Sequence, residues 1–149
     1  MVFMRIMGLD FGDKRIGVAV SDPTGLIAQG LAVLERGKSL KADLLRVRDL
    51  AEKNEVETIV IGLPRNMDGS LGPQAEKVRM FGQKLAGLLD LPVKYWDERL
   101  TTMAAEKLLI QADVSRARRR KVIDKMAASL ILQGYLDFHS KSQGFSTDA

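Results

Sequence analysis

Residues 4–22 constrain the fold more than any other part of this chain. Two apolar runs, at 6–9 and 16–20, are separated by a short turn at 12–14 that contains a glycine. Runs of this length, rich in small and β-branched residues, predict a β-hairpin. The first strand ends at Asp10, and an acid that faces a core is unfavourable there unless a cation meets it. Asp10 is therefore the first candidate for an active-site residue.

Composition limits the classes of protein to which such a hairpin can belong. The 149 residues are 46% hydrophobic and 28% charged, which is typical of one globular domain. The chain has no cysteine and one histidine, His139, which excludes a thiolate metal site and argues against a histidine cluster or a Ser-His-Asp triad. A formal charge of +4 and a pI near 9.5 are compatible with a polyanionic partner, although many basic proteins bind none.

The apolar runs of the chain are too short to cross a membrane. The first residues also lack the order of basic, apolar and small residues that marks a signal peptide. We therefore expect a cytoplasmic protein that does not bind membranes, either a monomer or a homodimer.

The remaining chain alternates between strand and helix patterns. Further strands are predicted at 31–35, 58–63 and 91–96, and helices at 40–54, 73–89, 103–111 and 122–138. Tight turns join the first three strands and helices precede the later ones. This order predicts an α/β fold with a mixed five-stranded sheet, antiparallel in its first three strands with parallel additions, flanked by helices. Residues 1–139 form a single domain in this interpretation, and 140–149 a flexible C-terminal tail.

Local signals support these boundaries. Ser39 is placed to cap the first helix, and Pro73 to begin the second. The apolar stripe of the first helix comprises Leu40, Leu44, Val47 and Ala51, and that of the second Val78, Phe81, Leu85 and Leu88. Trp96 ends the last predicted strand, and we assign it to packing.

Two further acids are placed where they could join Asp10. Glu98 follows the last predicted strand, and ligands collect at the carboxyl ends of strands in sheets of this kind. Asp124 shares one helical face with Ala127, Ala128, Ile131 and Tyr135. It is therefore an acid on the stripe that packs against the sheet. The alternative is that Asp124 lies at the edge of that stripe and pairs with Arg119 or Lys121.

Three converging carboxylates form a metal site made only of oxygen ligands. Such sites suit Mg²⁺ or Mn²⁺. Two such ions, roughly 4 Å apart, activate a water and stabilise the leaving oxygen in phosphodiester hydrolysis, so no histidine, cysteine or lysine base is needed. Asp10, Glu98 and Asp124 are thus the predicted catalytic and metal-binding residues of a nuclease.

Four stretches strongly resemble the YqgF/RuvX family, the pre-16S rRNA nucleases also described as Holliday junction resolvases. They are residues 8–22 (GLDFGDKRIGVAVSD), 61–73 (IGLPRNMDGSLGP), 97–106 (DERLTTMAAE) and 123–133 (IDKMAASLILQ), in the order found in the family. The resemblance implies a ribonuclease-H-like fold. It matches the acidic positions of the family to Asp10, Glu98 and Asp124. Related resolvases usually carry a fourth acid one helical turn beyond the last of these, where this chain has Ala127.

The resemblance also implies a function. It favours cleavage at the 5′ side of the small-subunit rRNA precursor, with ribosomal proteins or the pre-ribosome as partners. The residues themselves do not separate that RNA from branched DNA, so a Holliday junction resolvase is the alternative.

Basic and polar residues near the three acids are candidate substrate contacts. These are Lys14, Arg15, Asn66, Arg99, Arg116, Arg118, Arg119, Arg120 and Lys121. The run at 116–121 places five cations in six residues, a pattern that fits contacts with a phosphate backbone. A solvated surface run, a structural ion pair of Arg99 and a purely local turn role for Asn66 are the alternatives.

Two interpretations from other classes stay open. A nucleotide-binding ATPase-like fold shares the Gly-x-Asp-x-Gly form of 8–12, but it clamps its nucleotide between two domains, and this chain has room for one. In a non-catalytic nucleic-acid-binding module the acids would be structural, and binding would survive the loss of Asp10.

Overall fold

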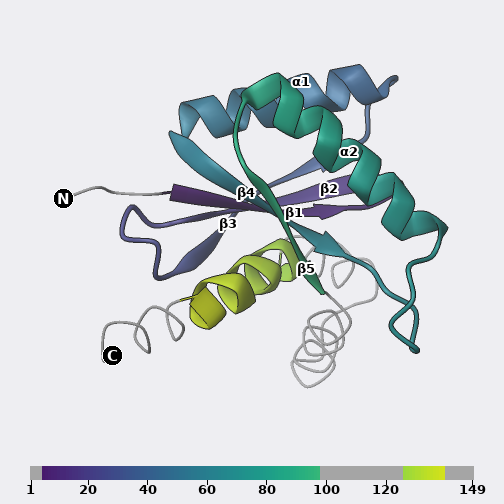
Figure 1. Ribbon diagram of the computed structural model, residues 1–149. Helices are drawn as coiled ribbons and strands as arrows, with labels where there is room; N and C mark the ends of the chain where they lie inside the picture. The colour runs from purple at the N-terminus through teal and green to yellow at the C-terminus, as the bar shows by residue number, and fades with distance from the viewer. Residues whose placement is uncertain (1–4, 98–125, 140–149) are drawn as a thin grey trace, which may run out of the picture.

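The computed structural model describes residues 5–97 and 126–139, which form a five-stranded sheet with helices on both faces (Figure 1). The elements are β1 (Arg5–Phe11), β2 (Arg15–Ser21), β3 (Ala28–Glu35), α1 (Leu40–Lys53), β4 (Val56–Leu63), α2 (Pro73–Leu89), β5 (Val93–Asp97) and a helix over 126–139. Within these residues no helix is both long and apolar enough to cross a membrane.

The strand order β3-β2-β1-β4-β5 confirms the predicted mixed sheet. β1 and β2 pair in antiparallel fashion, as do β2 and β3, because tight turns join them. β4 lies parallel to β1 and β5 parallel to β4, because α1 and α2 return the chain to the same end of the sheet. β1 therefore stands at the centre, with a parallel neighbour on one side and an antiparallel neighbour on the other.

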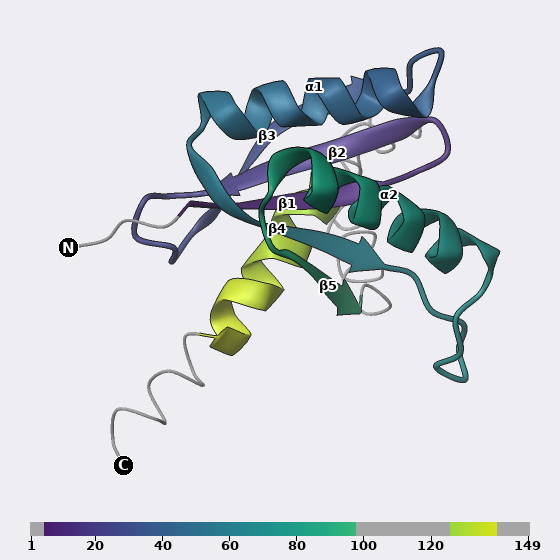
Figure 2. The ribbon, with the colours of Figure 1, turned by 45° about the horizontal axis from the view of Figure 1, so that its top comes forward.

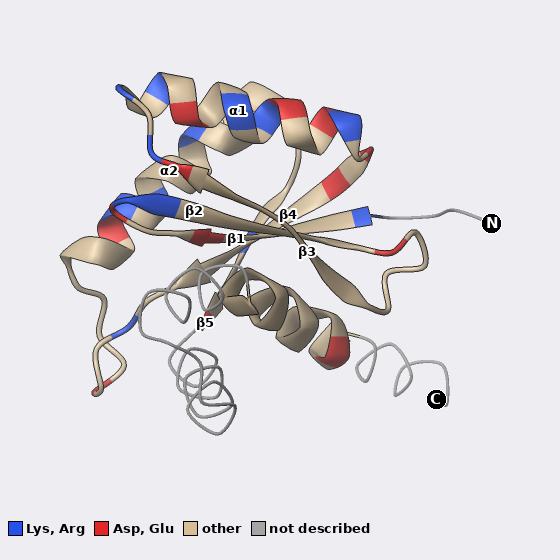
Figure 3. Ribbon diagram, turned by 180° about the vertical axis from the view of Figure 1, so that it is seen from behind, with Lys and Arg blue, Asp and Glu red and all other residues tan. Residues whose placement is uncertain are grey.

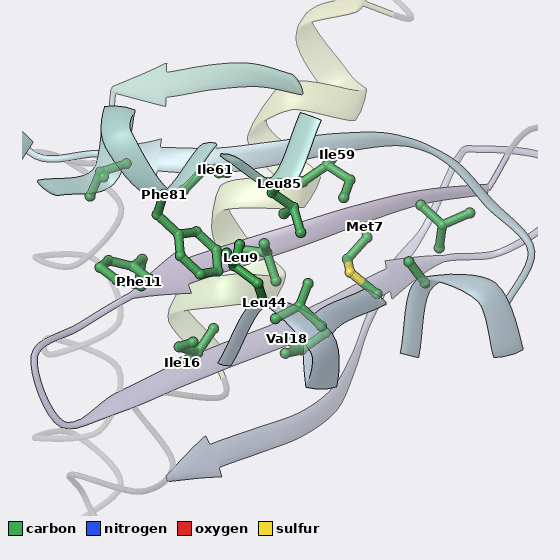
Figure 4. Packing of buried hydrophobic residues seen from close by; sticks show 14 of the residues in the cluster. Met7, Leu9, Phe11, Ile16, Val18, Leu44, Ile59, Ile61, Phe81 and Leu85 are labelled. Carbon is green, nitrogen blue, oxygen red and sulfur yellow. The ribbon is translucent and has the colours of Figure 1, made fainter. Parts of the chain in front are cut away.

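One face of the sheet packs against α1 and α2. Met7, Leu9 and Phe11 alternate along β1 toward this face and are buried in the larger hydrophobic cluster (Figure 4). The oxygen of Ser39 caps α1 by accepting a hydrogen bond from the backbone N–H of Ala42 at 3.1 Å, as predicted.

The predicted stripe of α2 is wrong at its last member. Val78, Phe81 and Leu85 are buried, but Leu88 is 42% exposed. The spacing of 3.6 residues per turn carries the buried face from Leu85 to Leu89, which packs against the core instead.

The helix at 126–139 covers the opposite face of the sheet (Figure 2). It buries Ala128, Ile131 and Leu132 against Ala19 and Val60. Trp96 packs against the same helix, with its ring centroid 6.5 Å from that of Tyr135 and its indole beside Gly134. The assignment of Trp96 to packing is confirmed.

Gly8 is the point where this helix comes closest to β1. A Cβ at Gly8 would lie 2.7 Å from Cβ of Leu132 and 3.0 Å from the carbonyl oxygen of Ala128. Neither atom belongs to the flexible end of a side chain, so the helix itself would have to move. The absence of a side chain at Gly8 thus sets the distance between helix and sheet.

Replacing Gly8 with alanine is therefore expected to destabilise the protein by about 1–3 kcal/mol, the usual effect of overpacking. Urea unfolding measures this change. The control is Gly87→Ala, because a Cβ at Gly87 in α2 meets nothing within 4 Å. That variant is expected to be neutral or more stable, since alanine is the better helix former. Equal stability of the two variants would contradict the close approach at Gly8.

The turn between β2 and β3 is organised by Asp22. Its Oδ1 accepts hydrogen bonds from the backbone N–H groups of Leu26 at 2.8 Å and Ile27 at 2.9 Å, and Thr24 donates its hydroxyl to Oδ2. Gln133 ties the turn to the helix at 126–139 by donating to the Leu26 carbonyl oxygen at 3.0 Å. The bonds that Asp22 accepts, with that from Ile27 first, lower its pKa from 3.8 to about 2.

The lowered pKa of Asp22 predicts a pH dependence of stability. Because the carboxyl group binds its proton more weakly in the folded state, its contribution is complete above pH 3.8 and is lost as the pH falls toward about 2. We expect Asp22→Asn to lose less stability than the wild type over this interval, measured by urea unfolding. A carboxyl ¹³C titration of Asp22 with a midpoint near 3.8 would contradict the prediction.

Several predicted features lie outside the described residues. They are the helix at 103–111, residues 122–125 of the last helix, and the tail at 140–149.

Candidate active site

Asp10 lies near the carboxyl end of β1, on the face that the helix at 126–139 covers. Alternation along the strand places it on the same side as Gly8, against which that helix packs. Its partner in β2 is Gly17, and Gly62 of β4 follows Ile61, the residue that pairs with Leu9. The partly exposed Asp10 is thus flanked by a glycine in each neighbouring strand. Glycines at these positions let a ligand or another part of the backbone come close to the carboxylate.

Three strand ends meet at this edge of the sheet. β1, β4 and β5 are parallel, so their carboxyl ends point the same way, and Leu63 of β4 pairs with Asp97 of β5. Arg65, just beyond β4, lies 3.9 Å from Asp97 through Nε and Oδ2. Figure 3 shows acidic colouring near the ends of β1 and β5. The edge therefore carries carboxylates from two strands separated by β4.

The two basic residues of the first turn differ in their surroundings. Arg15 donates through Nε to Oε1 of Glu35 in β3 at 3.1 Å, with its own side chain largely covered. Lys14 is exposed, and its carbonyl oxygen accepts the backbone N–H of Arg36 at 2.8 Å. Arg15 thus has a structural ion pair, and a phosphate contact by either residue stays a prediction.

Asn66 organises the loop between β4 and α2. Its backbone N–H donates to the Ser70 carbonyl oxygen at 2.9 Å, and its side-chain amide donates to the Ser70 hydroxyl at 3.0 Å. The Gly69 N–H donates back to the Asn66 carbonyl oxygen at 2.8 Å. These bonds support the local turn role. The loop leaves the sheet at the same edge as Asp10, which is compatible with contact to a substrate, and that contact stays a prediction.

The other predicted site residues lie outside the described residues. They are Glu98, Arg99, Arg116, Arg118, Arg119, Arg120, Lys121 and Asp124. Within 5–97 and 126–139, no three His, Cys, Asp or Glu side chains gather closely enough to hold a metal ion. Ala127, at the position of the fourth acid in related resolvases, is described, and it is buried.

The sequence analysis missed Arg36 and Asp43, which form an ion pair beside the turn between β1 and β2. Nε of Arg36 lies 2.6 Å from Oδ2 of Asp43, whose side chain is only 1% exposed. A signal was present in the spacing, because Asp43 precedes Val47 and Ala51 by four and eight residues and so lies on the apolar stripe of α1. An acid on a buried stripe predicts a buried cation beside it.

Comparison with known proteins shows the family of this chain. The family model RuvX, described as a Holliday junction resolvase, matches residues 4–138. A "Putative pre-16S rRNA nuclease" of Halothermothrix orenii is 59% identical over 141 residues, covering 95% of this chain and all of the relative. One of Pelotomaculum thermopropionicum is 62% identical over 134 residues, covering 90% of this chain and 87% of the relative.

Among solved structures, T. thermophilus RuvC in complex with a Holliday junction substrate has a TM-score of 0.57 at 15% identity. The match covers 86% of this chain and 91% of RuvC, and the Thermus thermophilus RuvC structure alone gives 0.52. These likenesses confirm the ribonuclease-H-like fold. The match over residues 4–138 and the identities of 59% and 62% lead to one conclusion: this chain belongs to the RuvX family.

Proposed function

We propose that this protein is a metal-dependent nuclease that trims the 5′ end of the 16S rRNA precursor. RuvX is a family of nucleases, and its members act on nucleic acid. The observation that carries the proposal is the position of Asp10, a partly exposed carboxylate between two glycines at the carboxyl edge of a ribonuclease-H-like sheet.

The residues at this edge fit a hard divalent cation. Asp10 supplies carboxylate oxygens, the ligands that Mg²⁺ and Mn²⁺ prefer, and the neighbouring Gly17 and Gly62 add no side chain beside it. We propose that Glu98, directly after β5, and Asp124, two residues before the described helix begins, complete the ligand set. Bound divalent cations would supply an activated water and stabilise the leaving oxygen of a phosphodiester.

The choice of RNA rests on the relatives. The relatives that are 59% and 62% identical to this chain over the matched residues carry the name of an rRNA nuclease. The family description supports the second candidate, resolution of a four-way DNA junction. A resolvase cuts two strands symmetrically and would require a homodimer. Trimming of rRNA requires only one active site. In this proposal the protein acts in the cytoplasm, and its partners are the precursor particle and its ribosomal proteins.

The deciding experiment offers the protein both substrates. A labelled fragment of the 16S rRNA precursor and a four-way DNA junction are incubated with the protein in Mg²⁺, in Mn²⁺ and in EDTA. We expect cleavage of the RNA that EDTA abolishes. Cleavage of the junction alone would favour the resolvase, and binding of both substrates without cleavage would contradict the nuclease proposal.

The basic run at 116–121 is proposed to bind the phosphate backbone of the substrate. Replacing Arg116, Arg118 and Arg119 with glutamine should weaken RNA binding and flatten its dependence on salt, because each lost phosphate contact reduces the slope of log K against log salt by about 0.7 for single strands. Filter binding between low and moderate salt measures this slope. A triple glutamine variant at Lys41, Lys53 and Lys84, exposed on α1 and α2, is the control. Equal slopes for both variants would identify the run as a solvated surface.

A further inference from the structure

The side chain of Arg36 holds the turn that follows Asp10. Its Nη1 donates to the carbonyl oxygen of Gly12 at 2.9 Å, and its guanidinium carbon lies 4.5 Å from the ring centroid of Phe11. The backbone N–H of Arg36 donates to the carbonyl oxygen of Lys14 at 2.8 Å. Arg36 thus contacts the two residues that directly follow Asp10 and a third in the same turn.

Arg36 is itself fixed by Asp43, in the first turn of α1. Oδ2 of Asp43 lies 2.6 Å from Nε of Arg36, and Oδ1 accepts the backbone N–H of Gly37 at 2.7 Å. Asp43 is 1% exposed and the side chain of Arg36 is 23% exposed, so water competes little for this ion pair. The pair links the start of α1 to the turn between β1 and β2.

The other side chains that reach this turn hold it less closely. Nε2 of Gln74 lies 3.4 Å from the Phe11 carbonyl oxygen, and Nζ of Lys77 lies 3.5 Å from Oδ1 of Asp13 at the surface. Both come from α2, as does Phe81, whose ring packs on that of Phe11 at a centroid distance of 4.3 Å. The bond from Arg36 to Gly12 is shorter than either polar contact. It comes from the residue that follows β3, whereas the other two contacts come from α2.

We propose that Arg36, clamped by Asp43, is a positioning residue for the carboxylate of Asp10. The inference rests on the proposed function, in which Asp10 is a metal ligand. A ligand must be held within about 0.5 Å of its productive position, and groups hydrogen-bonded to a ligand typically change metal affinity or activity by about 10- to 100-fold. Arg36 acts one step further out, through Phe11 and Gly12. Arg36 bonds to Asp43 and Gly12 at once and lies over Phe11, a combination that the planar guanidinium allows and a lysine ammonium does not.

Arg36→Lys tests the proposal, because lysine keeps a cation for Asp43 but cannot span both partners. Mn²⁺ binding is measured by calorimetry without nucleic acid, and cleavage is measured separately at saturating Mn²⁺. We expect Mn²⁺ affinity and kcat each to fall by about 10-fold, the lower end of that range. Asp43→Asn, which keeps the shape of the clamp but not its charge, should show a smaller loss of the same kind and serves if the lysine variant does not fold.

Two reference variants separate positioning from a general loss of stability and from a failure of the proposed function. Val47→Ala removes buried methyl groups from α1 and lowers stability without touching the turn, so its Mn²⁺ affinity should equal that of the wild type. If Arg36→Lys matches Val47→Ala in Mn²⁺ affinity and kcat, the positioning role is overturned. If Asp10→Asn still binds Mn²⁺ and cleaves, the proposed function fails and takes the positioning role with it. Loss in Asp10→Asn with no loss in Arg36→Lys overturns the positioning role alone.

Discussion

Replacing Asp10 with asparagine is expected to lower the cleavage rate by a factor on the order of 10³ or more, the usual scale for loss of a residue that acts directly in catalysis. Asparagine is nearly isosteric with aspartate but carries no charge, and a neutral amide binds a hard divalent cation less tightly than a carboxylate. Because asparagine has nearly the shape of aspartate, the fold should not change. Single-turnover cleavage of the labelled RNA measures the loss, and circular dichroism and RNA binding check that the protein is intact.

The matched control is Asp13→Asn in the same hairpin. Asp13 is exposed in the turn and lies 3.5 Å from Nζ of the equally exposed Lys77, a pairing that contributes little. Cleavage by this variant should remain within about twofold of the wild type, a change below about 0.5 kcal/mol in activation free energy. If Asp10→Asn cleaved as fast as Asp13→Asn, Asp10 would be a structural acid. The non-catalytic binding module would then be the better interpretation.

The sheet was predictable because its determinants are local. Apolar runs and glycine-containing turns define the first three strands, and the helices between the later strands force parallel pairing. The position of Asp10 near a strand end could be predicted on the same grounds, since strand ends are visible in the sequence, and its place in the site stays a prediction. The capping role of Ser39 followed from its position before an apolar helical pattern.

Features that depend on contacts between distant elements were harder to predict. Arg36 contacts Gly12, 24 residues away, and nothing beside either residue in the sequence signals that hydrogen bond. The ion pair of Arg15 with Glu35 depends in the same way on the register of β2 against β3. Leu88 has the spacing of a buried residue, yet it is exposed in the last turn of α2. Sequence patterns define the helices and strands. Strand register and the packing of distant elements define which side chains contact each other.

The largest effect on stability is expected from Asp43→Ala. Asp43 is buried and accepts from Nε of Arg36 at 2.6 Å and from the backbone N–H of Gly37 at 2.7 Å. Removing one partner of a buried ion pair leaves the other charge without compensation, which typically destabilises a protein by about 3–5 kcal/mol. Urea unfolding at neutral pH should show a loss of this size. Asp49→Ala, at an exposed acid of the same helix that lies 3.2 Å from Arg48, should change stability by less than about 0.5 kcal/mol.

A double variant distinguishes the loss of attraction from the penalty of an unpaired charge. In Arg36→Met with Asp43→Leu, no charge remains to be buried, and replacing a buried pair by apolar residues of similar volume is often neutral or stabilising. This variant should therefore be more stable than Asp43→Ala, although it lacks the bond from Arg36 to Gly12. Its cleavage rate should nevertheless stay low, because stability would be restored without the hydrogen bond from Arg36 that holds the turn after Asp10. A double variant that recovered stability and activity together would mean that the pair stabilises the fold and does nothing further for the site.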